Sequence, residues 1–202
     1  MQENITAAIL AGGPGSRMNG LIKPLMMIGG ETIISRTLGV FSDNFTEIII
    51  VTNNPCEYSE FPLCRMVLDQ FTGIGPIGGI HAALKAASYD VVFICAGDMP
   101  LLNSRLIMRQ INLFNSLRCD ILVPKVGFSV EPLHAVYRRK VLTRLEEFLT
   151  SEKSNAVHEF FTMVDVKYME LDENEEIQYI FSKINVPSDI PAVERIIKRG
   201  RD

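Results

Sequence analysis

Residues 5–18 read ITAAILAGGPGSRM, an apolar run that stops abruptly in a loop rich in glycine. The run over residues 5–10 has the length and β-branched content of a buried parallel strand. Because glycine has no side chain, the backbone N–H groups of such a loop can come close to a phosphate. Arg17 and Lys23, downstream of the glycines, would supply positive charge to the same anion. This stretch therefore predicts a nucleoside triphosphate held at the edge of an α/β sheet.

The loop differs from two common phosphate-binding patterns. A Walker loop requires Gly-Lys-Ser/Thr after four intervening residues, and a dinucleotide fingerprint requires a further Gly three residues after Gly13-x-Gly15. Neither pattern is present. The alternative is an ordinary Gly/Pro turn after a strand, which is common. The basic residues that follow the glycines favour a phosphate loop of a third type.

Composition limits the class of protein. With 202 residues and 47% apolar content, the chain is expected to form a single domain, residues 1–202, with an ample core. The net charge of −4 argues against general nucleic-acid binding but allows a local basic pocket. The four cysteines lack C-x-x-C spacing, which predicts free, mostly buried thiols. No secretory leader and no apolar run near the ~20 residues of a membrane span are evident. We therefore expect a cytoplasmic protein that binds neither nucleic acid nor membranes.

Apolar runs and helical patterns alternate along the chain. The expected strands are residues 5–10, 48–51, 91–95, 121–123 and 133–137. The expected helices are residues 33–41, 80–87, a segment capped by Asn103, residues 138–149 and a segment after Pro187. Residues 171–178 are polar and predict a surface turn. This alternation indicates a doubly wound, mostly parallel, Rossmann-like sheet with ligands at the carboxyl ends of its strands.

Several motifs resemble one enzyme family. The stretch Leu10-Ala11-Gly12-Gly13-x-x-x-Arg17-Met18-x-Gly20-x-x-Lys23 resembles the signature of the molybdenum cofactor guanylyltransferases, a branch of the nucleotidyltransferases. Further matches follow in the same order: Asp69, GPIGG at residues 75–79, GDMP at 97–100, EPLHA at 131–135 and NVP at 185–187. The resemblance covers nearly the whole chain. Its first motif is specific for the nucleotidyltransferase class, and the later ones favour the cofactor branch.

The resemblance implies a reaction. The enzyme would transfer GMP from GTP to the terminal phosphate of molybdenum-bearing molybdopterin, giving the guanine dinucleotide cofactor and pyrophosphate. It implies Mg²⁺ as cofactor and GTP and molybdopterin as partners, and it allows protein partners that insert molybdenum or mature molybdoenzymes. A related cytidylyl branch has Leu-Ala-Ala-Gly where this chain has Leu-Ala-Gly-Gly, so Gly13 favours GTP over CTP.

Asp98, Lys23 and Arg17 are the expected catalytic residues. Asp98 follows an apolar run and is expected at the carboxyl end of a strand, where a carboxylate can hold Mg²⁺. The resemblance implies the same role, and the alternative is an Asp that turns the chain before Pro100. Lys23 and Arg17 would neutralise phosphate oxygens, because nucleotidyl transfer depends mainly on positioning and charge neutralisation. The resemblance also implies that Asp98 and Lys23 bind the nucleotide.

Other residues are expected to contact the ligands. Leu10, Ala11, Gly12 and Gly13 would meet the base and sugar through backbone atoms, and Asp69 resembles a further nucleotide-contacting acid of the family. An ordinary aspartate at a strand end is the alternative for Asp69.

The glycines of residues 75–79 either free helix N–H groups for an anion or only allow close packing. His81 is expected to pack or lie on the surface, and the family places the segment of His134 against the pterin.

The chain departs from the family pattern at two places. The family often has Gly-Gly-x-Asp-Lys where residues 19–23 read NGLIK, and Asn-Val-Asn-Thr-Pro where residues 183–187 read KINVP. Ser188 or Asp189 is expected to cap the last helix in place of the missing Thr. Because these departures affect the acceptor more than the nucleotide, two alternatives stay open. One is a cytidylyl- or sugar-phosphate nucleotidyltransferase, and the other is a GTP-binding adaptor without catalysis.

Overall fold

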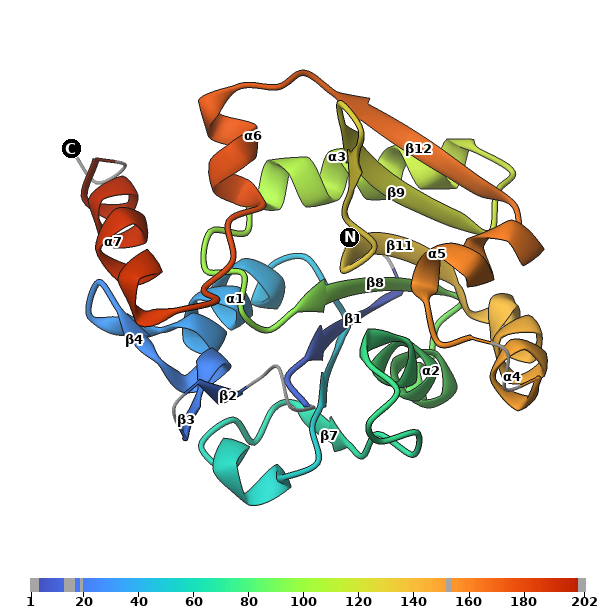
Figure 1. The fold of residues 1–202 in the computed structure, drawn as a ribbon, viewed down its shortest axis with the longest axis horizontal. Helices are drawn as coiled ribbons and strands as arrows, with labels where there is room; N and C mark the ends of the chain where they lie inside the picture. The colour runs from blue at the N-terminus through green and yellow to red at the C-terminus, as the bar shows by residue number, and fades with distance from the viewer. Residues whose placement is uncertain (1–3, 13–16, 19, 152–153, 200–202) are drawn as a thin grey trace.

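Strand β1 (Ile5–Leu10) has the predicted bounds and lies inside the sheet between two parallel neighbours. The computed structural model describes residues 4–12, 17–18, 20–151 and 154–199. It contains an eight-stranded sheet of order β10-β9-β11-β8-β1-β6-β7, with β12 paired to β9 (Figure 1). The other strands of this sheet are β6 (Glu47–Val51), β7 (Arg65–Val67), β8 (Val91–Ala96), β9 (Ile121–Val126), β10 (Ser129–Val130), β11 (His134–Arg138) and β12 (Val166–Leu171).

The sheet is mixed and mostly parallel, as predicted. Strands β7, β6, β1 and β8 run parallel to one another. Strand β11 runs antiparallel to β8 on one side and to β9 on the other. The carboxyl ends of four neighbouring strands and the amino end of β11 therefore meet at one edge of the sheet. We call this the carboxyl edge.

Helices cover both faces of the sheet. The core on one face contains side chains of α1 (Ile33–Ser42), α3 (Ser104–Ser116) and α6 (Glu175–Ile180). The core on the other face contains side chains of α2 (Pro76–Ala86), α4 (Leu142–Thr150) and α5 (Val157–Phe160). Successive side chains of a strand point to opposite faces, so Ala7 and Ile9 enter the first core and Ala8 the second. This two-sided burial explains why β1 reads as a continuous apolar run.

Most expected elements are confirmed, with shifts at their ends. The side chain of Asn103 caps α3, accepting a hydrogen bond of 3.0 Å from the Leu106 amide. The predicted helix over 80–87 begins earlier, at Pro76, because proline suits the first turn of a helix. The predicted helix over 138–149 begins later, since Arg138 is still paired in β11 and a 3-10 turn precedes α4.

Two elements differ from the sequence-based expectation. Residues 171–178 are not a surface turn: Leu171 ends β12, and α6 begins at Glu175. The Asn174 side chain caps α6 by accepting a hydrogen bond of 2.9 Å from the Ile177 amide. Strand β12 was not expected, because its position beside β9 leaves much of it exposed and its sequence is correspondingly polar.

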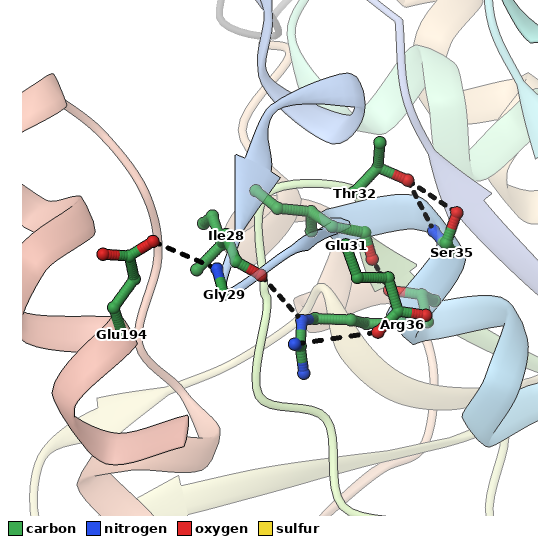
Figure 2. A network of polar contacts seen from close by, with 9 residues as sticks. Ile28, Gly29, Glu31, Thr32, Ser35, Arg36 and Glu194 are labelled. Atoms are coloured by element: carbon green, nitrogen blue, oxygen red, sulfur yellow. Dashed lines mark hydrogen bonds and ion pairs between the residues drawn. The ribbon is translucent and has the colours of Figure 1, made fainter. Parts of the chain in front are cut away.

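The last helix, α7 (Ile190–Arg199), packs on a short hairpin formed by β4 (Met27–Ile28) and β5 (Glu31–Thr32). A small core joins them, made of Ile28, Ile33, Ile184, Val193 and Ile197. Figure 2 shows the polar part of this contact, in which the Gly29 amide donates a hydrogen bond of 3.1 Å to Glu194. Arg36 braces the same hairpin by donating to the Ile28 carbonyl at 3.3 Å. The segment between α6 and α7 is thereby held against the rest of the fold.

The start of α7 is organised by Asp189. A 3-10 turn over Pro187–Asp189 precedes the helix, and the Asp189 carboxylate accepts hydrogen bonds from the amides of Asn185 and Val186. Asp189 therefore stabilises the turn before α7, which takes the place of the expected cap.

Three further observations complete the fold. A second hairpin, β2 (Arg17–Met18) with β3 (Leu21–Ile22), leads into the 3-10 turn Lys23–Leu25. All four cysteines are free, as predicted, but they are not mostly buried: Cys95 and Cys119 are buried, Cys64 is half-buried and Cys56 is exposed. Within the described ranges, the helices are all too short or too polar to cross a membrane.

The approach of α2 to the loop after β7 leaves no room for a side chain at Gly78. A Cβ atom there would lie 2.6 Å from the Phe71 carbonyl oxygen and 2.9 Å from the Asp69 carboxylate. We predict that Gly78→Ala lowers the free energy of unfolding by about 1–2 kcal/mol, because overpacking outweighs the helix propensity of alanine. Gly39→Ala in α1 is the matched control, since no atom lies within 4 Å of its Cβ position. Urea unfolding would contradict this prediction if Gly78→Ala were as stable as the wild type.

His134 is fully buried in β11, edge-on to the rings of Phe93 and Phe181 at 5.1 Å each. Neither ring nitrogen has a hydrogen-bond partner among the described residues. Burial, reinforced by the nearby charge of Lys183, lowers the pKa of His134 from 6.5 to about 4. The folded protein therefore holds this side chain neutral at physiological pH.

This depressed pKa predicts a loss of stability in mild acid. The unfolded chain takes up the proton near pH 6.5, but the folded protein takes it up only near pH 4. The stabilising contribution is thus present above pH 6.5 and is lost as the pH falls toward 4, by about 2 kcal/mol between pH 7 and pH 5. Unfolding measured at both pH values should show a smaller loss for His134→Leu than for the wild type. Equal losses would show that His134 titrates normally.

Candidate active site

A cleft of about 320 Å³ opens at the carboxyl edge of the sheet. The last residues of β1, β6 and β8 form its floor, namely Leu10, Val51 and Ala96. Loops and the first turns of helices form its walls: Gly12, Lys23, Pro24, Asp69, Gly73, Gly75, Pro76, Gly79, Gly97, Asp98, Leu133, Lys183 and Asn185. Ligands of open α/β sheets bind at this position.

Lys23 is a buried cation in the wall of the cleft, with a side chain 8% exposed. Its ammonium lies 3.3 Å from Asp98 Oδ2 and donates a hydrogen bond of 3.3 Å to Asn185 Oδ1. A buried charge needs such partners, because taking it from water is costly. The 3-10 turn after β3, the loop after β8 and the segment before α7 therefore converge on one point. We call Lys23, Asp98 and Asn185 the polar triad.

Asp98 uses only part of its hydrogen-bonding capacity. One carboxylate oxygen contacts Lys23, and the other, Oδ1, is buried without a partner in the described part of the chain. Buried oxygens are normally satisfied, so an oxygen of this kind at a cleft can accept a bond from a ligand. Mg²⁺ is a hard cation that takes one or two protein carboxylates and shares its other positions between water and substrate phosphates. The residues present fit such an ion, and Asp98 is the residue that would hold it.

The loop after β8 is held tightly against the loop after β1. The Gly97 amide donates a hydrogen bond of 3.0 Å to the Leu10 carbonyl. A Cβ atom at Gly97 would lie 2.8 Å from Pro24 Cγ, so only glycine allows this approach. Asp98 is thereby fixed directly beside Lys23.

Asp69 lies in the cleft beside the carboxyl end of β7. Its backbone amide donates to Asn53, and its carboxylate accepts a hydrogen bond of 2.8 Å from the Phe71 amide. This turn fits the simple alternative of an aspartate at a strand end, and the position in the cleft fits the expected contact with the nucleotide. Both readings of Asp69 therefore stay compatible with the geometry.

Of the residues expected to contact the nucleoside, some line the cleft and one does not. Leu10 and Gly12 line the cleft, but Ala11 does not. The Ala11 amide donates to the Val51 carbonyl, and its carbonyl accepts from the Tyr58 hydroxyl, so its polar atoms serve the fold. Gly13 lies outside the described residues. Of Arg17 the structure describes the backbone, paired with Ile22, and not the side chain.

The glycines of residues 75–79 allow α2 to begin close to β1. Gly75 has a φ of 85°, which favours glycine, and it directly precedes the helix. A Cβ atom at Gly79 would lie 3.1 Å from the side chain of Leu10. Close packing is thus one clear role of these glycines. Their position in the cleft keeps anion binding at the start of α2 as a prediction.

The two histidines singled out in the sequence lie outside the cleft lining. His81 is buried in α2, 3.2 Å from a Glu146 oxygen and edge-on to Phe71, so it packs as expected. His134 is enclosed in the core, and its neighbour Leu133 lines the cleft instead.

Sequence reasoning assigned no role to Asn185 or Lys183, although both line the cleft. The signal for Asn185 was its match to the family motif, and for Lys183 the departure from it. The Lys183 ammonium pairs with the Glu131 carboxylate at 2.6 Å. Neither position could be assigned from spacing, because the packing of α7 brings them to the carboxyl edge.

Comparisons with known proteins show the family of this chain. Residues 7–166 match the family model of the MobA-like NTP transferase domain. A protein of Pelotomaculum thermopropionicum named probable molybdenum cofactor guanylyltransferase is 35% identical over 97% of this chain and 95% of its own length. One of Natranaerobius thermophilus with the same name is 31% identical over 98% of both chains.

The fold agrees as well. The crystal structure of molybdopterin-guanine dinucleotide biosynthesis protein A from Archaeoglobus fulgidus has a TM-score of 0.80 and 25% identity, covering 96% of this chain and 99% of that one. The matches extend over nearly the whole length of both proteins. The chain therefore belongs to the molybdenum cofactor guanylyltransferases, enzymes within the MobA-like NTP transferase family.

Proposed function

We propose that this enzyme transfers GMP from GTP to the terminal phosphate of molybdenum-bearing molybdopterin, releasing pyrophosphate. The names of its relatives support this reaction class. The observation that carries the proposal is the buried contact between Lys23 and Asp98, with Asp98 Oδ1 unpartnered in the cleft. This pair offers a fixed cation and a free carboxylate oxygen side by side, as a metal-assisted transfer between phosphates requires.

In the proposed reaction, an oxygen of the acceptor phosphate attacks the α-phosphorus of GTP. A new P–O bond forms, the bond from the α-phosphorus to the bridging oxygen breaks, and pyrophosphate leaves with that electron pair. Because the attacking phosphate is already ionised at neutral pH, no general base is needed. The protein must instead hold several negative charges together in line.

The polar triad is suited to this task. Lys23, held between Asp98 and Asn185, would place a positive charge on the α-phosphate without reorganising during the reaction. Asp98 would hold Mg²⁺, which neutralises triphosphate oxygens when bound. We infer that Arg17 covers the remaining phosphate charge. Leu10, Gly12 and Asp69 would bind the nucleoside at the β1–β6–β7 side of the cleft, and Gly13 is still expected to contact the base.

The proposal predicts selective stabilisation by nucleotide. GTP with Mg²⁺ should raise the thermal unfolding temperature, since a ligand that binds only the folded state stabilises it by ~2.7 kcal/mol at a hundred times its Kd. Pyrophosphate should then be released only when molybdopterin is added. Stabilisation by CTP alone would favour a cytidylyltransferase, and GTP binding without pyrophosphate release with any acceptor would favour an adaptor.

Asp98→Asn tests whether the Asp98 carboxylate holds the metal. The amide keeps the shape of the side chain but loses the charge that would hold Mg²⁺, so we expect kcat to fall by roughly a hundredfold or more. Asp43→Asn, in the exposed C-cap of α1, is the matched control and should behave as the wild type. Pyrophosphate release and circular dichroism would be measured on both variants. Wild-type turnover in a folded Asp98→Asn enzyme would remove the metal assignment.

A further inference from the structure

The order of the strands gives the cleft two ends. Along the carboxyl edge, Asp69 follows β7, Leu10 ends β1, Asp98 follows β8 and Leu133 precedes β11. Neighbouring strands lie about 4.8 Å apart, so four steps from β7 to β11 span roughly 19 Å. Asp98 lies between the end where the nucleoside is proposed to bind and the end at β11.

Lys183 provides the positive charge at the β11 end. Its partner Glu131 lies three residues before β11, and the Glu131 carbonyl accepts a hydrogen bond from the His134 amide. The next residue, Ile184, is fully buried and donates its amide to the Asp98 carbonyl at 3.0 Å. The backbone that carries Lys183 is therefore fixed beside Asp98, on the side away from Asp69.

The Lys183 ammonium is placed to take a further ligand. Its side chain is 31% exposed and lines the cleft. An ammonium has three N–H donors, and within the described ranges Glu131 is its one hydrogen-bonded partner. Lys23, by contrast, is buried against two partners. Lys183 therefore has more N–H donors available for a ligand than Lys23 has.

We propose that Lys183 binds the attacking phosphate of the acceptor and that Glu131 is the residue that positions it. This inference rests on the proposed function and names a group that recognises its second substrate. A phosphate monoester carries up to two negative charges and must approach the triphosphate, so repulsion opposes the reaction unless a cation lies on the acceptor side. Lys183 donates hydrogen bonds to the phosphate oxygens and transfers no proton.

Glu131 has a defined part in this arrangement. It holds the long lysine side chain in one direction before the acceptor arrives, which lowers the entropy lost on binding. It also balances the charge of Lys183 at the β11 end. An ion pair that served only the fold would respond equally to loss of either partner, whereas a lysine that binds phosphate would not.

Four variants distinguish these roles. Lys183→Met should raise the KM for molybdenum-loaded molybdopterin roughly tenfold to a hundredfold, the worth of a charge-assisted hydrogen bond, and leave the KM for GTP nearly unchanged. Glu131→Gln should change the acceptor KM far less, because the ammonium remains. Lys183→Arg should retain most of the acceptor affinity. Lys125→Met is the control. Lys125 is 33% exposed and forms an ion pair of 2.8 Å with Glu170, and it does not line the cleft.

The outcome is decided by comparison of the variants. An unchanged acceptor KM in Lys183→Met, or equal effects of Lys183→Met and Glu131→Gln, would overturn the inference. Should the wild type release no pyrophosphate, the proposed function fails, and direct binding still tests Lys183. Titration of molybdopterin followed by pterin fluorescence should then show weaker binding to Lys183→Met than to the wild type, and equal binding would overturn the inference.

Discussion

The site depends on one buried positive charge. Lys23 is almost inaccessible to water, so its ammonium must be neutralised by groups that the fold brings to it. Asp98 arrives from the end of β8, and Asn185 arrives from the segment before α7, 162 residues away in sequence. Removing either partner would leave a charge that is costly to bury. The contacts of the polar triad therefore fix the geometry of the cleft and stabilise its walls at the same time.

Strand β11, which runs antiparallel to both of its neighbours, gives the cleft its two different sides. A fully parallel neighbour of β8 would place another strand end at the carboxyl edge, followed by another helix connection. Because β11 runs the other way, the turn before it, with Glu131 and Leu133, reaches that edge instead. The loops that follow the parallel strands therefore lie beside a turn that precedes an antiparallel strand. In the proposed reaction, the nucleotide and the acceptor would meet there, beside Asp98.

The sequence predicts those parts of the structure whose signal is local in the chain. Strand β1 is buried on both faces, so its apolar run was sufficient to place it, and Asn103 marked the start of α3 by local capping chemistry. Strand β12 was missed because an exposed strand carries no such run. Lys23 and Asp98 could be predicted from motifs after strands, and the cleft contains both. The roles of Asn185 and Lys183 could not, because long-range packing of α7 decides where they lie.

Helix α7 positions a segment of the chain that lies beyond the matched family domain. The family match ends at residue 166, whereas Lys183 and Asn185 come later and are held by a helix that packs on the β4–β5 hairpin (Figure 2). The matched domain supplies Lys23, Asp98 and Glu131, and the segment after it supplies Asn185 as a partner of Lys23 and Lys183 as the partner of Glu131. Substitutions in this last segment would reach the cleft without changing the matched domain. A short C-terminal segment thus completes a cleft whose other walls belong to the matched domain.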